Sequence, residues 1–266
     1  MEQAKKFNAQ AVNQHIVNWL KNYATKARVN GFVVGISGGI DSALTSTLCA
    51  QTELPTLCVE MPIHQAASQV LRGEEHIQFL LNKFPNVSRA KADLTQSYDV
   101  LAQSLPTTAN VEKLNLTLAN TRARLRMTTL YYYAGIHGYL VVGTGNKIED
   151  FGVGFFTKYG DGGVDISPIA DLMKSEVRLL SEYLGVTANI ITAKPTDGLF
   201  GDDRSDEDQL GANYDELEEA MLAHEMGKTA ADFEGRKQVV FKIYERLNRI
   251  NQHKMTPIPI CELKTL

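Results

Sequence analysis

Apolar residues follow two alternating patterns along this chain. Short continuous runs rich in β-branched residues occupy residues 31–36, 55–63 and 139–144 and predict strands buried on both faces of a parallel sheet. Apolar positions at helical spacing predict helices that alternate with these runs, over residues 12–23, 68–84, 95–105, 111–138 and 174–184. Ser68 is the expected start of the second of these helices. The alternation predicts an α/β fold with an open, mostly parallel sheet and helices on both faces, as in Rossmann-like proteins.

The last third of the chain has a different pattern. A glycine-rich segment at 152–165 and an acidic segment at 197–208 predict loops that become ordered over a bound ligand. Asn213 and Glu216 have capping-box spacing, and apolar positions between 240 and 247 mark a final helix. We expect these helices to cover the sheet or a partner subunit. Since no repeat or long linker divides the chain, residues 1–266 are expected to form one domain.

Composition limits the classes of partner. The 266 residues carry a net charge of -4, so the chain has no overall positive field for nucleic acid. No apolar stretch approaches the roughly 18 residues that cross a bilayer, and the N-terminus is polar, so no membrane association is expected. Three widely spaced cysteines argue against a disulfide framework. A cytoplasmic protein that binds small molecules is therefore predicted.

The strongest chemical signal is the segment VVGISGGIDSAL, residues 33–44. Gly38 and Gly39 allow backbone N–H groups to face an anion, and the N-terminus of the next helix adds partial positive charge. Ser37 and Ser42 supply hydroxyl groups, and Asp41 fits beside phosphates if a divalent cation bridges them. The segment is neither a Walker A loop nor G-x-G-x-x-G. The alternative is a plain strand-to-helix turn that Asp41 and Ser42 only cap.

This segment resembles the SGGxDS loop of the ATP pyrophosphatases, which have the adenine nucleotide alpha hydrolase-like fold. The resemblance implies cleavage of ATP between its α and β phosphates and adenylation of an oxygen on the second substrate. Further motifs are similar to the bacterial ammonia-dependent NAD synthetases, namely NTRARLRM (120–127), the segment 141–177 with FFTKYGDGG, TAKPTDGL (192–199) and HKM (253–255). That resemblance implies a carbon–nitrogen ligase that amidates deamido-NAD with ATP and ammonia and releases AMP and pyrophosphate.

The resemblance also implies roles for individual residues. Asp41 and Glu149 would hold Mg²⁺. ATP would contact the loop and three further positions: Gly35, Ile36, Ser37, Gly38, Gly39, Ile40, Asp41, Ser42, Thr144, Lys174 and Thr196. Deamido-NAD would contact Arg124, Lys158, Asp165, His253 and Lys254, near a homodimer interface formed partly by the long helices. Free ammonia is the expected nitrogen donor, because the synthetase pattern fills the chain and leaves no room for a glutaminase domain.

Ammonium must lose a proton before it can attack, so the reaction requires a carboxylate near the adenylate. Asp161 of KYGDGG is the candidate, and with Lys174 and Asp41 it completes the expected catalytic set. Each position also has a simpler interpretation. Glu149 could be a surface carboxylate, while Asp161 and Thr196 could be turn residues. The three arginines at 122, 124 and 126 cannot all bind one phosphate, because Arg124 points away from the other two. The simpler interpretation is that they lie on a solvent-exposed face of the helix.

Two departures from the family pattern are visible. Gly145 stands where relatives often carry a polar residue, and the segment between Glu149 and FFTK is one residue longer than in other branches. Rival functions are another adenylating enzyme of the GMP synthetase or tRNA-thiolating type, or a nucleotide-binding module without chemistry. The chain lacks the paired cysteines and basic surface of a thiolating enzyme. A pure binding module would not need Asp41, Glu149 and Lys174 together.

Overall fold

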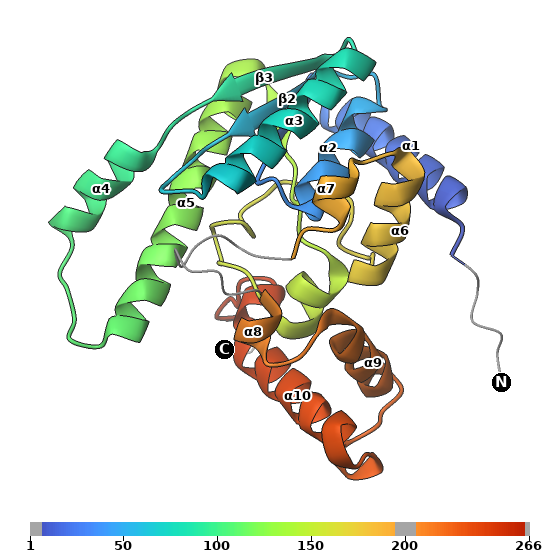
Figure 1. The fold of residues 1–266 in the computed structure, drawn as a ribbon, viewed down its shortest axis with the longest axis vertical. Coiled ribbons are helices and arrows are strands. Elements are labelled where there is room, and N and C mark those ends of the chain that lie inside the picture. The colour runs from blue at the N-terminus through green and yellow to red at the C-terminus, as the bar shows by residue number, and fades with distance from the viewer. Residues whose placement is uncertain (1–6, 195–205, 264–266) are drawn as a thin grey trace.

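Four parallel strands form one sheet in the computed structural model, which describes residues 7–194 and 206–263 (Figure 1). The strand order is β3-β2-β1-β4, with bounds Val87–Lys91, Thr56–Glu60, Gly31–Gly35 and Tyr139–Val141. Val33 of the central strand β1 lies in register with Leu57 of β2 and Val141 of β4. Because all four strands run in the same direction, their carboxyl ends meet at one edge of the sheet.

Helices cover both faces of the sheet, as expected. Alternate residues of β1 point to opposite faces, so Phe32 and Val34 belong to one apolar core and Val33 to another. The first core is formed with α1 (Ala9–Ala27), α2 (Ile40–Ala50), α3 (Ala67–Lys83), α6 (Lys174–Leu184) and α7 (Ala188–Ile191). The long helix α5 (Val111–His137) covers the other face, with α4 (Thr95–Ser104) beside it (Figure 1).

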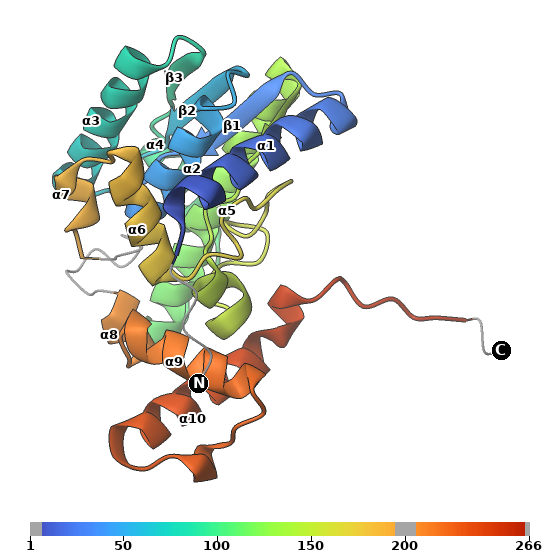
Figure 2. The ribbon, with the colours of Figure 1, turned by 90° about the vertical axis from the view of Figure 1, so that its right-hand side faces the viewer.

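The C-terminal helices build a core of their own beside the sheet (Figure 2). They are α8 (Asp206–Leu210), α9 (Tyr214–Glu225), a short 3-10 helix η2 (Ala230–Asp232) and α10 (Gly235–Met255). Their apolar side chains pack against η1, a π-helix at Ile148–Val153, rather than spreading over the sheet. The capping box of α9 is confirmed, since the Glu216 N–H donates to Asn213 Oδ1 at 2.9 Å and the Asn213 N–H to Glu216 Oε2 at 3.1 Å.

Several element boundaries differ from the sequence expectation. Strand β3 was not predicted, because Ser88 and Arg89 expose polar side chains on an edge strand that shows no apolar run. Helix α3 begins at Ala67, so Ser68 lies inside its first turn and does not cap it. The apolar positions between 240 and 247 lie within the final helix, α10, as expected. The acidic segment expected at 197–208 lies mostly outside the described residues.

Two expectations from composition can be compared with the structure. All three cysteines are free thiols, and Cys49 and Cys58 are buried as predicted for positions in a helix and a strand. In the described ranges, no helix is both long and apolar enough to span a bilayer.

His76 of α3 is a buried titratable group in the first core. Its Nε2 lies 2.9 Å from Ser46 Oγ of α2, while Nδ1 has no hydrogen-bond partner in the part of the chain that the structure describes. Burial lowers the pKa of His76 from 6.5 to about 4, since the charged ring would lose its hydration. The folded state therefore requires a neutral imidazole at this position.

We expect this histidine to make the fold sensitive to acid. A pKa that is lower in the folded than in the unfolded state contributes stability that is complete above pH 6.5 and is lost as the pH falls toward 4. Between pH 8 and pH 5 the loss should be about 2 kcal/mol. Urea unfolding at both pH values checks this, with His76→Gln expected to remove most of the difference. His15→Gln, at an exposed position of α1, should leave it unchanged, and equal pH dependence in all three proteins would contradict the assignment.

Candidate active site

The chain between β1 and α2 forms a loop that is held by hydrogen bonds within itself and by one from Arg72 Nε of α3 to the Gly38 carbonyl at 3.3 Å. Gly38 has a φ of +81°, and a β-carbon there would overlap the carbonyl oxygen of Gln69 in α3, so only glycine fits. The Gly39 N–H donates to Ser37 Oγ at 3.2 Å, and the Ser37 N–H donates to Ser42 Oγ at 3.3 Å. The loop is therefore preformed at the N-terminus of α2, where partial positive charge favours an anion.

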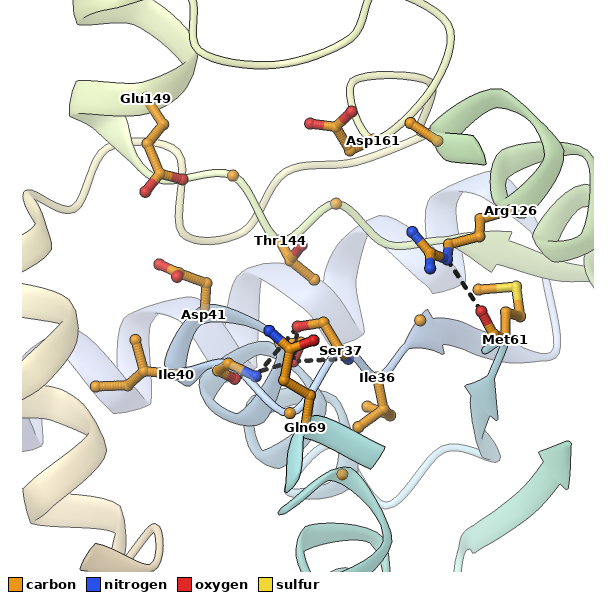
Figure 3. A pocket seen from close by; sticks show the side chains of 18 of the residues that line it. Ile36, Ser37, Ile40, Asp41, Met61, Gln69, Arg126, Thr144, Glu149 and Asp161 are labelled. Carbon is orange, nitrogen blue, oxygen red and sulfur yellow. Dashed lines mark hydrogen bonds between the residues drawn. The ribbon is translucent and has the colours of Figure 1, made fainter. Parts of the chain in front are cut away.

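A cavity of about 300 Å³ opens over this loop. It is bordered by the carboxyl ends of β1 and β2, the chain after β4, and the first turn of α6. Figure 3 shows Asp41, Thr144, Glu149 and Asp161 around it, although they come from widely separated segments. All predicted loop positions from Gly35 to Ser42 line it, together with Lys174. The structure thus brings together most of the predicted ATP and catalytic residues.

A buried ion pair lies at one side of this cavity. Lys174, 2% exposed and the first residue of α6, has its Nζ 2.6 Å from Asp41 Oδ2 and 3.0 Å from Glu149 Oε1. Burial alone would lower the pKa of Lys174, but the two carboxylates outweigh it and raise that pKa. Asn146 donates to Asp41 Oδ1 at 3.0 Å, and the Tyr214 hydroxyl donates to Glu149 Oε1 at 2.6 Å. The two carboxylates therefore keep the Lys174 ammonium in its charged form between them.

The same carboxylates fit a divalent cation. Asp41 and Glu149 supply four carboxylate oxygens, of which Lys174 contacts one on each residue, Asp41 Oδ2 and Glu149 Oε1. Within the described ranges, no group of three or more histidine, cysteine or acidic side chains could hold a metal alone. Mg²⁺ ordinarily uses one or two protein carboxylates and completes its shell with water and substrate phosphates. The donor set therefore fits Mg²⁺ bound together with a nucleotide.

Asp161 borders the same cavity from the glycine-rich loop. The Thr157 N–H donates to its Oδ1 at 3.0 Å. Burial nevertheless raises the pKa of Asp161, because desolvation of the carboxylate exceeds the effect of that hydrogen bond. A carboxyl group with a raised pKa can accept a proton closer to neutral pH than an exposed aspartate.

The two departures from the family pattern meet at Asp150. The longer segment after Glu149 forms the π-helix η1, in which one extra residue is accommodated within the helical turn. The carboxylate of Asp150 lies over Gly145, where a β-carbon would overlap it. Burial and the charges of Glu149, Asp161 and Asp41 raise the pKa of Asp150, which also lines the cavity. A side chain at position 145 would therefore have to displace the acidic side chain five positions later.

The residues expected to contact deamido-NAD lie outside the lining of this cavity. Arg124 donates to the carbonyl of Lys158 at 3.3 Å, and Lys158 donates to the carbonyl of His253. Lys254 donates to the Phe156 carbonyl at 2.7 Å and also to that of Gly154.

Asp165 accepts hydrogen bonds from Tyr131 at 2.9 Å and from the Val141 N–H at 2.8 Å. Arg124 and Arg126 point in different directions, as predicted. Arg124 donates to the Lys158 carbonyl, whereas Arg126 lines the cavity and donates to the Met61 carbonyl at 3.0 Å. Thr196 lies outside the described residues. The substrate roles of this set stay predictions.

Sequence reasoning missed four polar side chains of the site. Asn146 and Tyr214 hold the two carboxylates, and Asp150 and Arg126 line the cavity. The longer segment after Glu149 was the signal for Asp150. Tyr214 gave no signal, because it lies 65 positions from Glu149 and marks only a helix start.

A family model described as NAD synthase matches residues 12–257. The chain belongs to the NAD synthase family. A curated relative from Carboxydothermus hydrogenoformans, an NH(3)-dependent NAD(+) synthetase, is 36% identical over 93% of this chain and 95% of its own length. The expected ligase class is confirmed, and the relatives support ATP-dependent amidation of deamido-NAD.

Solved structures agree with this assignment and with the predicted fold. The NMN synthetase of Francisella tularensis superposes with a TM-score of 0.83 at 30% identity, over 97% of this chain and 100% of its own. The NH3-dependent NAD synthetase of Campylobacter jejuni gives 0.76 at 26% identity, over 96% and 100% of the two chains. The α/β architecture expected from the sequence is therefore confirmed.

Replacing Gly145 tests the fit of Asp150. In Gly145→Ala the new β-carbon must displace the Asp150 carboxylate, and overpacking of this kind costs about 1–3 kcal/mol. We expect a lower melting temperature and a lower rate, both restored in part by the double variant Gly145→Ala, Asp150→Gly. Gly135→Ala is the matched control, because nothing lies within 4 Å of a β-carbon at that position of α5. An unchanged Gly145→Ala protein would contradict this packing.

Proposed function

We propose that this chain amidates the nicotinate carboxylate of deamido-NAD in two steps in the cavity over the loop. One observation carries the proposal: a preformed anion-binding loop and the buried Lys174 ammonium with its two carboxylates border the same cavity. An oxide ion cannot leave from a carboxylate, whereas AMP can leave from its adenylate. The site has to stabilise the pyrophosphate that departs when this adenylate forms.

In the first step, a carboxylate oxygen of the substrate attacks the α phosphorus of ATP, and the bond between that phosphorus and the bridging oxygen breaks. Negative charge collects on pyrophosphate. The partial positive charge at the N-terminus of α2 and the Lys174 ammonium would stabilise that charge. Asp41 and Glu149 would hold Mg²⁺, which neutralises phosphate charge when bound. Thr144 and Thr196 are the further proposed ATP contacts, and Thr144 lines the cavity.

In the second step, ammonia attacks the acyl carbon and AMP leaves with the electron pair of the broken bond. The incoming nitrogen loses one proton in forming the amide, and ammonium loses one more before it can attack. Asp161 is the proposed acceptor, because its pKa is raised and it borders the cavity. Arg124, Lys158, Asp165, His253 and Lys254 are proposed to bind the rest of deamido-NAD beyond the cavity.

A second substrate has a specific observation in its favour. The Francisella neighbour that superposes at 0.83 over its whole length is named an NMN synthetase. Nicotinate mononucleotide carries the same carboxylate as deamido-NAD and would undergo the same chemistry. It lacks the second nucleotide, so it would depend less on contacts outside the cavity.

We also propose the setting in which the enzyme works. Residues 1–266 would act as one synthetase domain fed by free ammonia, which the NH(3)-dependent naming of the relatives supports. A homodimer is supported by the exposed apolar side chains along α5, among them Val111, Leu116, Tyr132 and Ile136. The free thiols fit a reducing, cytoplasmic setting.

Product analysis tests the function directly. Purified protein with deamido-NAD, ATP, Mg²⁺ and ammonium should form NAD, AMP and pyrophosphate in equal amounts. The same assay with nicotinate mononucleotide compares kcat/KM for the two substrates. Formation of ADP and orthophosphate would exclude adenylation, and ATP binding without either product would favour a nucleotide-binding module.

Changing Lys174 tests its role in the first step. Lys174→Met keeps the side-chain length but removes the charge, so pyrophosphate release in a single turnover should slow by about 100-fold or more. Aminolysis of a preformed adenylate should change little. Circular dichroism checks the fold, because the two partly buried carboxylates lose the cation that neutralises them. Lys237→Ala removes an exposed partner of Glu219 and should leave the rate unchanged, and a defect limited to ammonia capture would contradict the assignment.

A further inference from the structure

Tyr214 reaches the ion pair from the C-terminal core. It is the first residue of α9 and is 1% exposed, and its hydroxyl donates to Glu149 Oε1 at 2.6 Å. The Lys174 ammonium lies over its ring, 4.8 Å from the ring centre. One side chain thus contacts both partners of the pair through two different interactions, a hydrogen bond and a cation–π contact.

The contacts of Glu149 are one-sided. Lys174 and Tyr214 both bond Oε1, and Oε2 accepts no hydrogen bond from any described residue. Glu149 also lines the cavity. The two donors therefore fix the carboxylate by one oxygen and leave the other available to a ligand of the cavity.

These two donors differ in how firmly they are held. Lys174 reaches Glu149 through four methylene groups and is the cation that would follow the phosphates of a nucleotide. Tyr214 has a rigid ring and belongs to the same buried cluster of the C-terminal core as Leu217, Phe241 and Tyr244. Its backbone N–H donates to Glu207 Oε1 at 3.2 Å, next to the capping box that starts α9. Tyr214 is therefore the donor that keeps its position when Lys174 moves.

We propose that Tyr214 is a positioning residue whose hydroxyl orients Glu149 for the divalent cation. The packing of the C-terminal core would thereby determine where the Glu149 carboxylate lies in the active site. The proposal rests on the proposed function of Asp41 and Glu149 as metal ligands. Removing the hydroxyl would leave Glu149 free to rotate once Lys174 turns toward phosphate. Metal binding would weaken, while the contacts of ATP with the loop would remain.

The test measures metal binding directly. Mn²⁺ titrated into the full-length protein with α,β-methylene-ATP, followed by electron paramagnetic resonance, gives the metal affinity without turnover. Tyr214→Phe removes one oxygen, and loss of a hydrogen bond to a charged group should weaken Mn²⁺ binding by about tenfold. The Mg²⁺ concentration for half-maximal rate should rise by a similar factor. The KM for deamido-NAD at saturating Mg²⁺ should stay within twofold, which a general loss of structure would not allow.

Two further variants distinguish failure of the positioning role of Tyr214 from failure of the metal assignment of Glu149. Tyr244→Phe alters another buried tyrosine of the same core and should leave Mn²⁺ affinity unchanged, because Tyr244 makes no hydrogen bond to any site residue that the structure describes. Glu149→Gln should weaken it more than Tyr214→Phe does, and an unchanged affinity there would overturn the metal assignment itself. If Glu149→Gln weakens binding but Tyr214→Phe equals wild type, the positioning role is wrong and the proposed function stands. If the Phe variant misfolds, Tyr214→Met also lacks the hydroxyl donor, and its Mn²⁺ affinity is expected to fall in the same way.

Discussion

The ammonium of Lys174, buried between Asp41 and Glu149, is the interaction on which the arrangement of the site depends. Its three members come from the loop after β1, the π-helix η1 and the start of α6. A charge taken out of water is costly unless it is paired, and removing one partner of such a pair leaves an uncompensated buried charge. The three segments are therefore held in one geometry by a shared electrostatic requirement, before any nucleotide is present.

This requirement joins the two parts of the molecule. The sheet with its flanking helices fixes the loop and Asp41, since the loop follows directly from the central strand. The C-terminal helices form a separate core that fixes Glu149, through packing against η1 and through the Tyr214 hydroxyl. The cavity is therefore bordered by side chains that both units hold in place.

The main elements could be predicted because each depends on a local pattern. Strands β1 and β2 are continuous apolar runs. The loop from Gly35 to Ser42 was recognisable from its residue types alone. Strand β3 was not, because an edge strand with exposed Ser88 and Arg89 has no distinctive pattern. The π-helix was visible only as one extra residue whose structural meaning the sequence did not reveal.

What the sequence determined by itself was the sheet class, the loop from Gly35 to Ser42 and the family chemistry, because these rest on side chains close together along the chain. Tertiary structure decided which distant side chains meet. Asn146 holds Asp41 across 105 positions, Tyr214 holds Glu149 across 65, and Asp150 fills the space over Gly145. No local pattern encodes such contacts, since each depends on where two separately packed cores place their surfaces. The physical reason is that a buried charge is satisfied in three dimensions, by whichever donor the completed fold brings within hydrogen-bond distance.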